Sequence, residues 1–290
     1  MKNKPISMNA KQVSQNINKI VYTNNHNKQL TTDIVIAEQP LQISLSWQEK
    51  GLDTTKVFAI TMRTPGDDEQ LILGLLLSEG IIQSINDINS IFPEENEEST
   101  EHNLWEVKLS SEITPNITSL ERFQITYSSC GLCGTTSLKS LELKNPPILN
   151  DEHDWLPITH IYAFPEIMRQ HQLLFEKTGG VHTAALFDEQ GKLIIIKEDI
   201  GRHNALDKLV GTILQQSSSN LTHQAIVISS RISFEMIQKT VMVGVPVLIA
   251  IGAPSDLAIK AAKRFNLTLI GFANRHSFNV YHGDWRLRQE

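Results

Sequence analysis

The 290-residue sequence predicts an α/β protein whose second half contains a parallel sheet. Short, nearly continuous apolar runs recur from residue 225 onward, and segments of helical length separate them. Runs of this kind are typical of strands that helices cover on both faces of a sheet. The pattern predicts strands at 225–229, 246–251 and 267–271 and helices at 233–243 and 256–265, which together form a βαβαβ unit.

The first half predicts a smaller unit of strands and one helix behind a loose arm. Residues 1–30 are rich in Asn, Gln and Lys and predict a flexible N-terminal arm. A helix is expected to begin at Asp67 or Asp68, whose carboxylate would accept from free first-turn amides, and to end at Gly80. Alternating apolar and polar residues predict strands at 33–37, 41–47, 56–62, 104–109 and 123–127, with a polar loop at 93–103.

Between these two regions the sequence predicts both helices and strands. We expect helices at 135–143, 165–177 and 203–214, and a hairpin formed by residues 181–187 and 192–197. The resulting domain organisation is a flexible arm at 1–30, an N-terminal subdomain at 31–127 and an α/β domain at 128–290. The last of these starts with a mobile loop that carries two cysteines.

Composition indicates a soluble cytoplasmic protein. The net charge of −6 argues against nucleic acid as a partner, and two cysteines are too few for a disulfide framework. The polar N-terminus lacks the apolar region of a signal peptide. The longest apolar stretch, residues 241–253, is too short to span a bilayer and contains Pro246, so no membrane association is expected.

The only two cysteines, Cys130 and Cys133, concentrate the thiol chemistry of the chain at one point. Two thiols at this spacing can form half of a metal site, a short disulfide or a persulfide carrier. A structural zinc site needs four ligands, and the chain has neither a second cysteine pair nor a histidine pair placed to complete a finger with Cys130 and Cys133. The H-x-E string of the zinc nucleotide deaminases is also absent, so we predict no bound metal.

A thioredoxin-like redox site remains a second possibility for the cysteine pair. The predicted strand before the pair and the predicted helix after it fit that site, and a helix N-terminus would lower the pKa of a thiol. Gly131 and Gly134, however, indicate a mobile loop rather than a rigid turn. A mobile loop suits a group that must visit both a sulfur donor and an acceptor. Two purely structural cysteines are the plainest alternative, although inert cysteines are usually buried.

The loops that follow the parallel strands form a second candidate site. Ligands of parallel α/β sheets bind beyond the carboxyl ends of the strands, here residues 229–231, 252–255 and 271–277. Arg231 and Arg275 could pair with phosphate oxygens, and Phe272 could stack on a base. Ordinary turns with solvent-facing arginines would explain the same residues equally well.

Two histidines stand at possible functional positions. His182 follows a Gly-Gly turn, and His203 follows Arg202 at the start of a predicted helix. A neutral histidine can move protons in thiol chemistry, but capping and core hydrogen bonding are the interpretation we favour for both.

Taken together, these motifs resemble the FdhD family, the formate dehydrogenase accessory sulfurtransferases. The resemblance covers residues 33–287 in family order. It rests on TPGD at 64–67, LSEGII at 77–82, SCGLCG at 129–134, GGVHTAA at 179–185, EDIGRHNALDK at 198–208, SRISFEM at 230–236, LTLIGF at 267–272 and FNVY at 278–281.

This resemblance implies a sulfur carrier with a cytidine-deaminase-like α/β sandwich core and a smaller N-terminal α+β subdomain. Such a protein accepts persulfide sulfur from a cysteine desulfurase and transfers it to the molybdenum bis(molybdopterin guanine dinucleotide) cofactor of formate dehydrogenase. Family members are commonly homodimers. Carried over to this chain, Cys130 would bear the persulfide and Cys133 would assist its transfer. The residues implied to bind the cofactor are Phe272, Ala273, Asn274, Arg275, His276 and Ser277.

One departure from the family pattern concerns the last of these residues. The family usually has Gly and then Arg directly before the FNVY string, whereas this chain has His276 and Ser277, with Arg275 upstream. Arg275 or His276 would therefore have to replace the usual arginine. Two other functions stay open on the sequence alone, a non-catalytic cofactor-binding chaperone and a C-x-x-C dithiol oxidoreductase.

Overall fold

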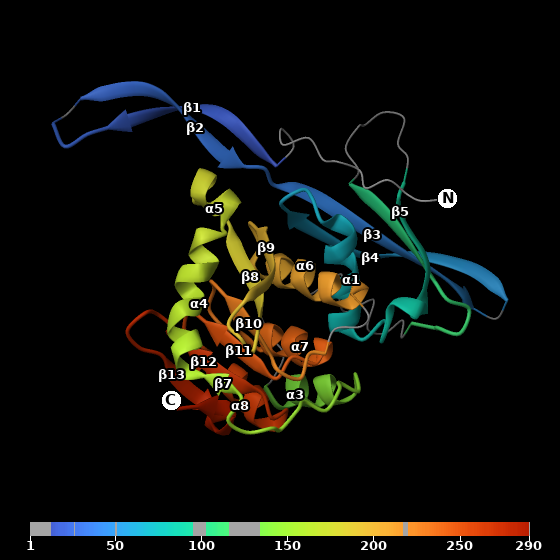
Figure 1. The fold of residues 1–290 in the computed structure, drawn as a ribbon. Helices are drawn as coiled ribbons and strands as arrows, with labels where there is room; N and C mark the ends of the chain where they lie inside the picture. Colours follow the sequence, from blue (N-terminus) through green and yellow to red (C-terminus); the bar gives the residue numbers. More distant parts are fainter. Residues whose placement is uncertain are drawn as a thin grey trace.

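The computed structural model describes residues 13–25, 27–49, 51–94, 103–115, 134–216 and 220–289 (Figure 1). Its first half contains one long helix among strands. These elements are β1 (Ser14–Tyr22), β2 (Lys28–Ile36), β3 (Gln39–Glu49), β4 (Leu52–Arg63), α1 (Asp68–Glu79), the short 3₁₀ helix η1 (Ile85–Asp87), β5 (Ile88–Pro93) and β6 (Leu104–Leu109). β1 and β2 form a hairpin of their own, and the other strands form a mixed sheet in the order β4-β3-β6-β5.

The second half alternates strands and helices around a six-stranded sheet. It begins with α3 (Gly134–Glu142), β7 (Leu156–Pro157), α4 (Ile158–Gln170), α5 (Leu173–Thr178), β8 (His182–Asp188), β9 (Leu193–Asp199) and α6 (Arg202–Gln215). It continues with β10 (Gln224–Ile228), α7 (Phe234–Val243), β11 (Val247–Ala250), α8 (Asp256–Arg264), β12 (Thr268–Gly271), β13 (Asn279–His282), η2 (Asp284–Arg286) and β14 (Leu287–Arg288). The strand order is β13-β12-β11-β10-β8-β9, with β10, β11 and β12 parallel.

The central strands of the six-stranded sheet, β10, β11 and β12, are buried on both faces because they are nearly continuous apolar runs. Along β10, Ile226 and Ile228 belong to a large cluster shared with α1, α6, α7, α8 and the N-terminal sheet. The alternating residues Ala225 and Val227 belong to a second cluster with α4. Since successive side chains of a strand point to opposite faces, helices cover both sides of the sheet, as the sequence predicted.

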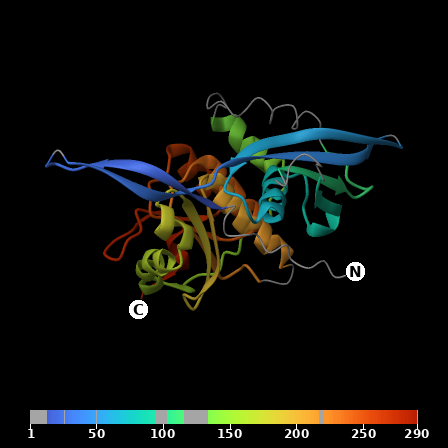
Figure 2. The same cartoon turned by 90° about the horizontal axis from the view of Figure 1, so that it is seen from above.

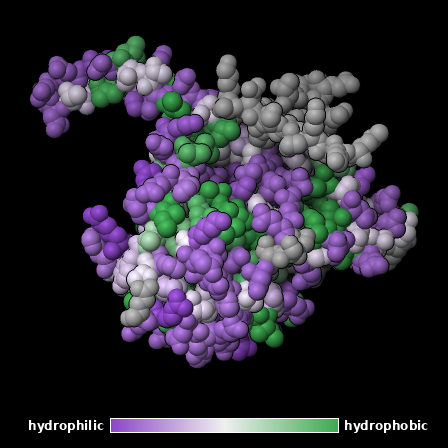
Figure 3. All heavy atoms as spheres, viewed as in Figure 1, coloured by the Kyte–Doolittle hydropathy of each residue, from purple (hydrophilic) through white to green (hydrophobic). Residues whose placement is uncertain are grey.

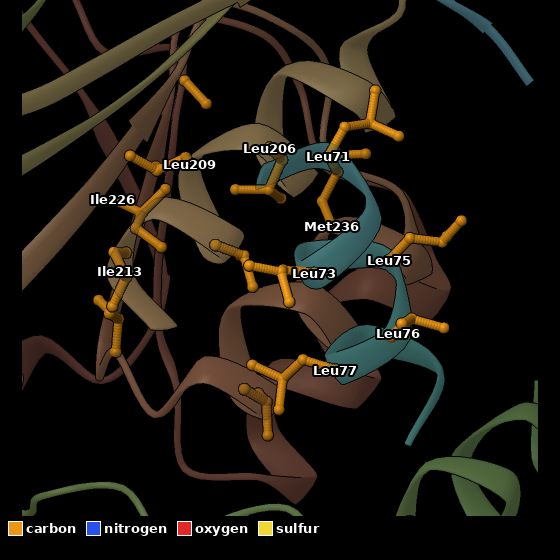
Figure 4. Close-up of a cluster of buried hydrophobic side chains, with 14 of the residues drawn as sticks. Leu71, Leu73, Leu75, Leu76, Leu77, Leu206, Leu209, Ile213, Ile226 and Met236 are labelled. Atoms are coloured by element: carbon orange, nitrogen blue, oxygen red, sulfur yellow. The ribbon is translucent and has the colours of Figure 1, made fainter. Parts of the chain in front are cut away.

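Helix α1 is apolar on all sides and lies within the larger cluster (Figure 4). Its buried side chains include Leu71, Ile72, Leu73, Leu75, Leu76 and Leu77, of which all except Leu75 and Leu77 are at most 1% exposed. A helix that is hydrophobic all round must be enclosed, here by the β3–β6 sheet on one side and by α6 and α7 on the other. Burial of each leucine stabilises the fold by roughly 2 kcal/mol.

Glycine allows α1 and α6 to touch through their backbones. A Cβ atom at Gly74 would lie 2.0 Å from the carbonyl oxygen of Asp207, and one at Gly211 would lie 1.9 Å from that of Gln70. Real Cβ atoms never come this close, so any larger residue at either position would have to push the helices apart.

Buried ion pairs surround this helix contact. The guanidinium of Arg63 donates two hydrogen bonds to Asp68, at 2.8 and 3.0 Å, and both side chains are at most 2% exposed. Lys208 lies 2.7 Å from Asp199 and also donates to the carbonyl of Thr64 at 2.8 Å. These bonds tie the loop before α1 to the start of α6, so the TPGD and EDIGRHNALDK strings meet in space.

Most predicted elements are confirmed, including the hairpin at β8 and β9, the βαβαβ unit and β6. The predicted helix at 165–177 is wrong in extent, because α4 starts at Ile158, includes Pro165 and ends at Gln170, and α5 is a separate helix. Asp67 stands at the N-cap of α1, as predicted, but makes no capping bond. The Asp68 carboxylate binds Arg63 instead.

The N-terminal arm also differs from the expectation. Residues 14–22 and 28–36 form a regular antiparallel hairpin where the sequence predicted a loose arm up to residue 30. The predicted strand at 123–127 and the loop with Cys130 and Cys133 lie outside the described residues. The domain boundaries and the flexibility of the arm stay predictions.

Replacing Gly211 by Ala should lower the free energy of unfolding by about 3 kcal/mol or more, because a methyl group must separate two helices that meet at backbone distance. Urea unfolding followed by circular dichroism measures this loss. Gly180→Ala is the matched control, since the nearest atom to its Cβ, on Ile36, lies at an ordinary 3.4 Å. Equal midpoints for the two variants would show that the helices do not depend on this contact.

Candidate functional site

The carboxyl ends of the parallel strands meet the starts of two helices at one edge of the six-stranded sheet. β8 runs antiparallel to β10, so its first residue lies beside the end of β10. His182 in turn pairs with Asp199, the last residue of β9, and α6 starts at Arg202 directly after it. We call this side of the sheet the carboxyl edge; it gathers the ends of β9 to β12 and the N-termini of α6 and α7.

Three loops pack tightly at the carboxyl edge. A Cβ atom at Gly252 would lie 2.7 Å from the carbonyl oxygen of Ser230, so the loops after β10 and β11 touch through backbone. Ile232 and Pro254 form an isolated parallel bridge between the same loops. The amide of Phe272 donates to the Gly252 carbonyl at 3.2 Å, which adds the loop after β12.

Phe272 has a strained and exposed conformation. Its φ of 56° is in the left-handed region, which costs a residue with a Cβ about 1–2 kcal/mol. Its side chain is nevertheless 47% exposed, so core packing does not offset that strain. Residues held in such sparsely populated backbone conformations cluster at functional sites, which makes this loop a candidate for ligand contact.

The rest of the β12–β13 loop is held in shape by Asn274. Its carboxamide oxygen accepts from the amides of His276 and Ser277, at 2.9 and 3.1 Å, and its amide nitrogen donates to the Phe272 carbonyl at 3.0 Å. Arg275 is exposed and its Nε donates to His276 Nε2 at 2.9 Å. Two polar side chains are thus presented side by side to solvent.

Ala273 has a different environment from its neighbours in this loop. Its side chain is 1% exposed and belongs to the cluster shared with α4. Its amide donates to the Ala250 carbonyl at 3.0 Å. Of the six residues expected to bind a cofactor, Ala273 therefore has its methyl group turned into the core, and the other five surround it at the surface.

A group of titratable side chains lies between the starts of α6 and α7. His203 is influenced by the charges of Lys239, Arg202, Glu235 and His182. On α7, Glu235 and Lys239 are four residues apart and so share one face of the helix. The sequence indicated His182 and His203 but not the two α7 residues, although the four-residue spacing of Glu235 and Lys239 is a signal that both lie on one helix face.

The imidazole of His203 is neutral under ordinary conditions. Burial lowers its pKa to about 4, and the positive charges of Lys239 and Arg202 lower it in the same direction. Its Nε2 is buried without a hydrogen-bond partner among the described residues. A neutral ring between two cations can exchange hydrogen bonds with a ligand but is too weak a base to be charged near pH 7.

The same environment also shifts the pKa values of two neighbours of His203, His182 and Glu235. Burial lowers the pKa of His182, and Arg202 lowers it further, against an opposing effect of Asp199. For Glu235 burial raises the pKa, but the Ser233 hydroxyl, its own backbone amide and the charges of His203 and Lys239 outweigh that effect, so the pKa is lowered. The group as a whole therefore contains neutral histidines and an ionised carboxylate.

A second row of buried polar groups lies one helical turn deeper. Lys239 donates to Asp207 at 2.6 Å, and the hydroxyl of Ser78 in α1 donates to the same carboxylate oxygen at 3.3 Å. Burial raises the pKa of Asp207 to about 6, although Lys239 opposes the shift. Gln238 donates to the Ser78 carbonyl and to Glu79, which binds Lys144 on the segment after α3.

Helix α3 starts at Gly134, the residue after Cys133, and its far end is attached to the body. Leu141 is fully buried, Glu142 forms an ion pair with Arg264 at the end of α8, and Lys144 lies 2.7 Å from Glu79 at the end of α1. α7 and α8 start at the carboxyl edge, so the end of α8 marks the opposite edge of the sheet. The attachment of α3 therefore lies at that opposite edge.

Within the described ranges, no group of three or more His, Cys, Asp or Glu is arranged to hold a metal ion. Nor does any helix of these ranges have the length and apolar character to cross a membrane.

The fold and site thus define an α/β protein with an exposed aromatic loop beside a histidine-containing edge, and with its thiols on a separate segment. The sequence profile of the FdhD/NarQ family matches residues 36–288 of this chain. Because that match covers most of the sequence, the protein belongs to the FdhD/NarQ family.

Named relatives agree with this assignment. The sulfur carrier protein FdhD of Streptomyces avermitilis is 42% identical over 88% of this chain and 89% of its own length. That of Saccharolobus solfataricus is 39% identical over 86% of this chain and 89% of its own. A crystal structure from Desulfotalea psychrophila, assigned to formate dehydrogenase accessory proteins, covers 95% of this chain and 99% of its own with a TM-score of 0.71; at 24% identity it supports the fold.

His203 should remain uncharged at pH 5.5, since its pKa of about 4 lies far below the usual 6.5. NMR titration of the ring nitrogens measures this directly. The variant Arg202→Gln removes one of the charges that lower the pKa and should move the midpoint upward. A ring that is half protonated near pH 6.5 in the wild type would contradict the buried, cation-flanked position of His203.

Proposed function

We propose that this protein is a sulfur carrier that takes sulfur from a cysteine desulfurase and delivers it to the molybdenum bis(molybdopterin guanine dinucleotide) cofactor for formate dehydrogenase, in the cytoplasm. Membership of the FdhD/NarQ family, with relatives named as sulfur carriers over nearly their whole length, carries this proposal. The concentration of both thiols in one C-x-x-C string supports it.

Sulfur is first loaded onto Cys130. The Cys130 thiolate attacks the outer sulfur of a persulfide on the donor enzyme, because the thiolate is the nucleophilic form of cysteine. A sulfur–sulfur bond forms on Cys130, the bond in the donor breaks, and the donor cysteine leaves as a thiolate. No external oxidant or reductant is needed for this exchange.

Release uses the second thiol. The Cys133 thiolate attacks the inner sulfur of the persulfide, a disulfide forms between Cys133 and Cys130, and the outer sulfur leaves as hydrosulfide towards the molybdenum acceptor. Two electrons pass from the thiols to the transferred sulfur. A dithiol reductant must therefore reduce the disulfide before the next cycle.

The carboxyl edge is the place where we propose that the acceptor binds. Phe272 offers an exposed ring on which a guanine can stack, and its strain indicates a ligand contact. Arg275 and His276 present adjacent polar groups to a phosphate, while Asn274 and Ser277 fix the loop. Ala273 would not touch the acceptor with its buried side chain but would anchor the loop to the sheet through its backbone. The β8–β12 core with α6, α7 and α8 supports a cytidine-deaminase-like fold for this domain.

The tether of the thiols is long enough for such a transfer. α3 has nine residues and is about 13 Å long, and four further residues to Cys130 add at most about 14 Å. α7, with ten residues, separates the two edges of the sheet by about 15 Å. The combined span of about 27 Å exceeds this separation, so a pivot of α3 about its attached end would bring Cys130 to either edge.

Incubation with a cysteine desulfurase and cysteine should add one sulfur atom, about 32 Da, to the wild-type protein but not to Cys130→Ala. Cys133→Ala should accept the sulfur and fail to release it, because no second thiol can form the disulfide. Intact-mass spectrometry measures both results. Sulfur that appears on another residue of Cys130→Ala would refute the role of Cys130.

The same variants separate this function from two alternatives. If Cys130→Ala combined with Cys133→Ala still activates formate dehydrogenase in cells, the protein acts as a cofactor-binding chaperone. If the wild type forms a reversible disulfide and never a persulfide, it is a dithiol oxidoreductase.

Phe272→Gly should weaken the binding of a guanine nucleotide about 10-fold or more, because stacking is worth roughly 1–3 kcal/mol. The free energy of unfolding should change by no more than about 1 kcal/mol, since glycine accepts the left-handed backbone without strain. Isothermal titration with GDP and urea unfolding test the two parts. Ile148→Gly is the control, because Ile148 is fully exposed and precedes β7, far from this loop in sequence. Equal nucleotide affinity in both variants would place the nucleotide elsewhere.

A further inference from the structure

The surface of the protein is mainly hydrophilic on the face seen in Figure 3, and its apolar side chains lie there in separate groups. Polar side chains without a partner are therefore a more informative feature of this molecule than apolar patches. Three of them lie close together at the carboxyl edge, where β8, β9 and β10 meet the starts of two helices.

Two of these three side chains are arginines. Arg202 starts α6 and Arg231 follows β10, and neither forms a hydrogen bond or an ion pair with another residue in the part of the chain that the structure describes. Elsewhere in the fold the buried cations Arg63, Lys208 and Lys239 each lie against a carboxylate. Unpaired cations in a protein with a net charge of −6 mark a place that can receive an anion.

The third side chain, His182, stands between the two arginines. β8 has β9 and β10 as its neighbours, and the ends of those strands lead to Arg202 and Arg231. The start of β8 is joined to the end of β10 through Thr183, whose amide donates to the Ser229 hydroxyl at 2.9 Å and whose carbonyl accepts from the Ser229 amide at 3.0 Å. Two strand spacings, about 10 Å, therefore separate the backbones that carry the arginines.

The imidazole of His182 is partly exposed and neutral. It forms no hydrogen bond with another described residue. Burial lowers its pKa, and the charge of Arg202 lowers it further. A neutral imidazole keeps one N–H group, which can donate to an anion that the neighbouring guanidinium attracts.

The carboxylates near this group are already engaged by other cations. Asp199 pairs with His182 in the sheet, but it is 0% exposed and its carboxylate lies 2.7 Å from Lys208. Glu235, at the start of α7, interacts with Lys239. Neither carboxylate forms an ion pair with Arg202 among the described contacts, so the capacity of this arginine to bind an anion is unused.

The group lies between two landmarks of the fold. On one side, the β1–β2 hairpin and α5 adjoin the start of β8 (Figures 1 and 2), and Ile36 of β2 approaches Gly180. On the other side, Gly252 touches the backbone of Arg231 and accepts from the amide of Phe272. The unpaired side chains and the exposed aromatic ring therefore belong to one continuous edge.

We propose that His182 and Arg202 form the site that receives the transferred sulfur as hydrosulfide, with Arg231 adding positive potential beside it. This inference rests on the proposed function, because it concerns the release step. The Cys133 thiolate attacks the inner sulfur of the Cys130 persulfide and a disulfide forms. The outer sulfur leaves with the bonding electron pair and its proton, so the negative charge of the thiolate ends on hydrosulfide. The guanidinium and the imidazole N–H stabilise that charge where it appears.

The distance along the edge fits the proposed acceptor. In the strand order β13-β12-β11-β10-β8-β9, β8 is three spacings, about 14 Å, from β12, which leads to Phe272. Only β13 lies beyond β12 in the described sheet, so the edge extends mainly towards His182. Ribose, diphosphate and pterin separate the guanine of the cofactor from its metal. A cofactor with its guanine on Phe272 would thus have its metal several strands away, near His182, and its phosphates between them.

The first experiment follows release in a single turnover of the full-length protein. The protein is loaded by a desulfurase and cysteine, separated from the donor, and the hydrosulfide that it releases is trapped with monobromobimane. Arg202→Gln should accept one sulfur atom like the wild type but release it about 10-fold or more slowly, because the leaving sulfur loses its stabilising charge. Arg202→Lys keeps the charge and should release faster than Arg202→Gln.

The matched control is Arg288→Gln, since Arg288 is an exposed arginine of β14, outside the carboxyl edge. It should release hydrosulfide at the wild-type rate. Equal release rates for loaded wild type and loaded Arg202→Gln would overturn the proposal, and so would equal slowing in Arg202→Gln and Arg288→Gln. A wild type that never gains sulfur would instead contradict the proposed function, and the second experiment then decides the site by itself.

The second experiment measures binding to the unloaded protein. Sodium hydrosulfide should shift the ring-nitrogen NMR signals of His182 in a saturable way, and Arg202→Gln should need about 10-fold more of it. His182→Gln identifies the signals. GDP bound at Phe272 should leave the hydrosulfide shift intact. The absence of a shift, displacement of hydrosulfide by GDP, or a larger shift with sodium phosphate than with sodium hydrosulfide would overturn the proposal, the last two in favour of a phosphate site.

Discussion

Helices α1 and α6 meet at backbone distance because each has a glycine at the point of contact, Gly74 on one and Gly211 on the other. This constraint positions the two halves of the protein. α1 carries the N-terminal sheet on its other side, and α6 carries His203 of the carboxyl edge as its second residue. Because only glycine permits so close a crossing, the two helices have little freedom to slide past each other. The β4-β3-β6-β5 sheet and the edge that bears Phe272 therefore keep a fixed relation.

Three of the strings that resemble the family, TPGD, LSEGII and EDIGRHNALDK, meet at this same junction. Thr64, Asp199 and Lys208 bind one another across it, and Ser78 contacts Asp207. Buried ion pairs are poor sources of stability, since desolvation offsets most of their attraction, but breaking one leaves an unpaired buried charge. They therefore favour one arrangement of α1 and α6 over others. A motif can be characteristic of a family without touching a substrate.

The sequence predicted the βαβαβ unit because its strands are nearly continuous apolar runs, a local pattern that survives in the folded protein. It could not predict that Asp68 binds Arg63, since the burial of that pair depends on the enclosing sheet. The strands at 14–22 and 28–36 were not predicted in full because polar residues interrupt their apolar positions on both faces and no other described strand pairs with them. The loop at Phe272 was expected at the carboxyl edge, but its left-handed backbone and the inward methyl of Ala273 are tertiary features.

His203 and Asp207 lie one turn apart on α6, and their pKa shifts change the stability of the fold in opposite directions on acidification. The pKa of His203 is lower in the folded protein than in the unfolded chain, so between about pH 6.5 and 4 the unfolded chain binds more protons and stability falls on acidification. The pKa of Asp207 is raised to about 6, so between about pH 6 and 3.8 the folded protein binds more protons and stability rises. The two effects oppose each other over nearly the same range. A helix that holds a neutral histidine at the carboxyl edge thus carries, one turn deeper, a carboxylate that offsets the cost of that histidine in acid.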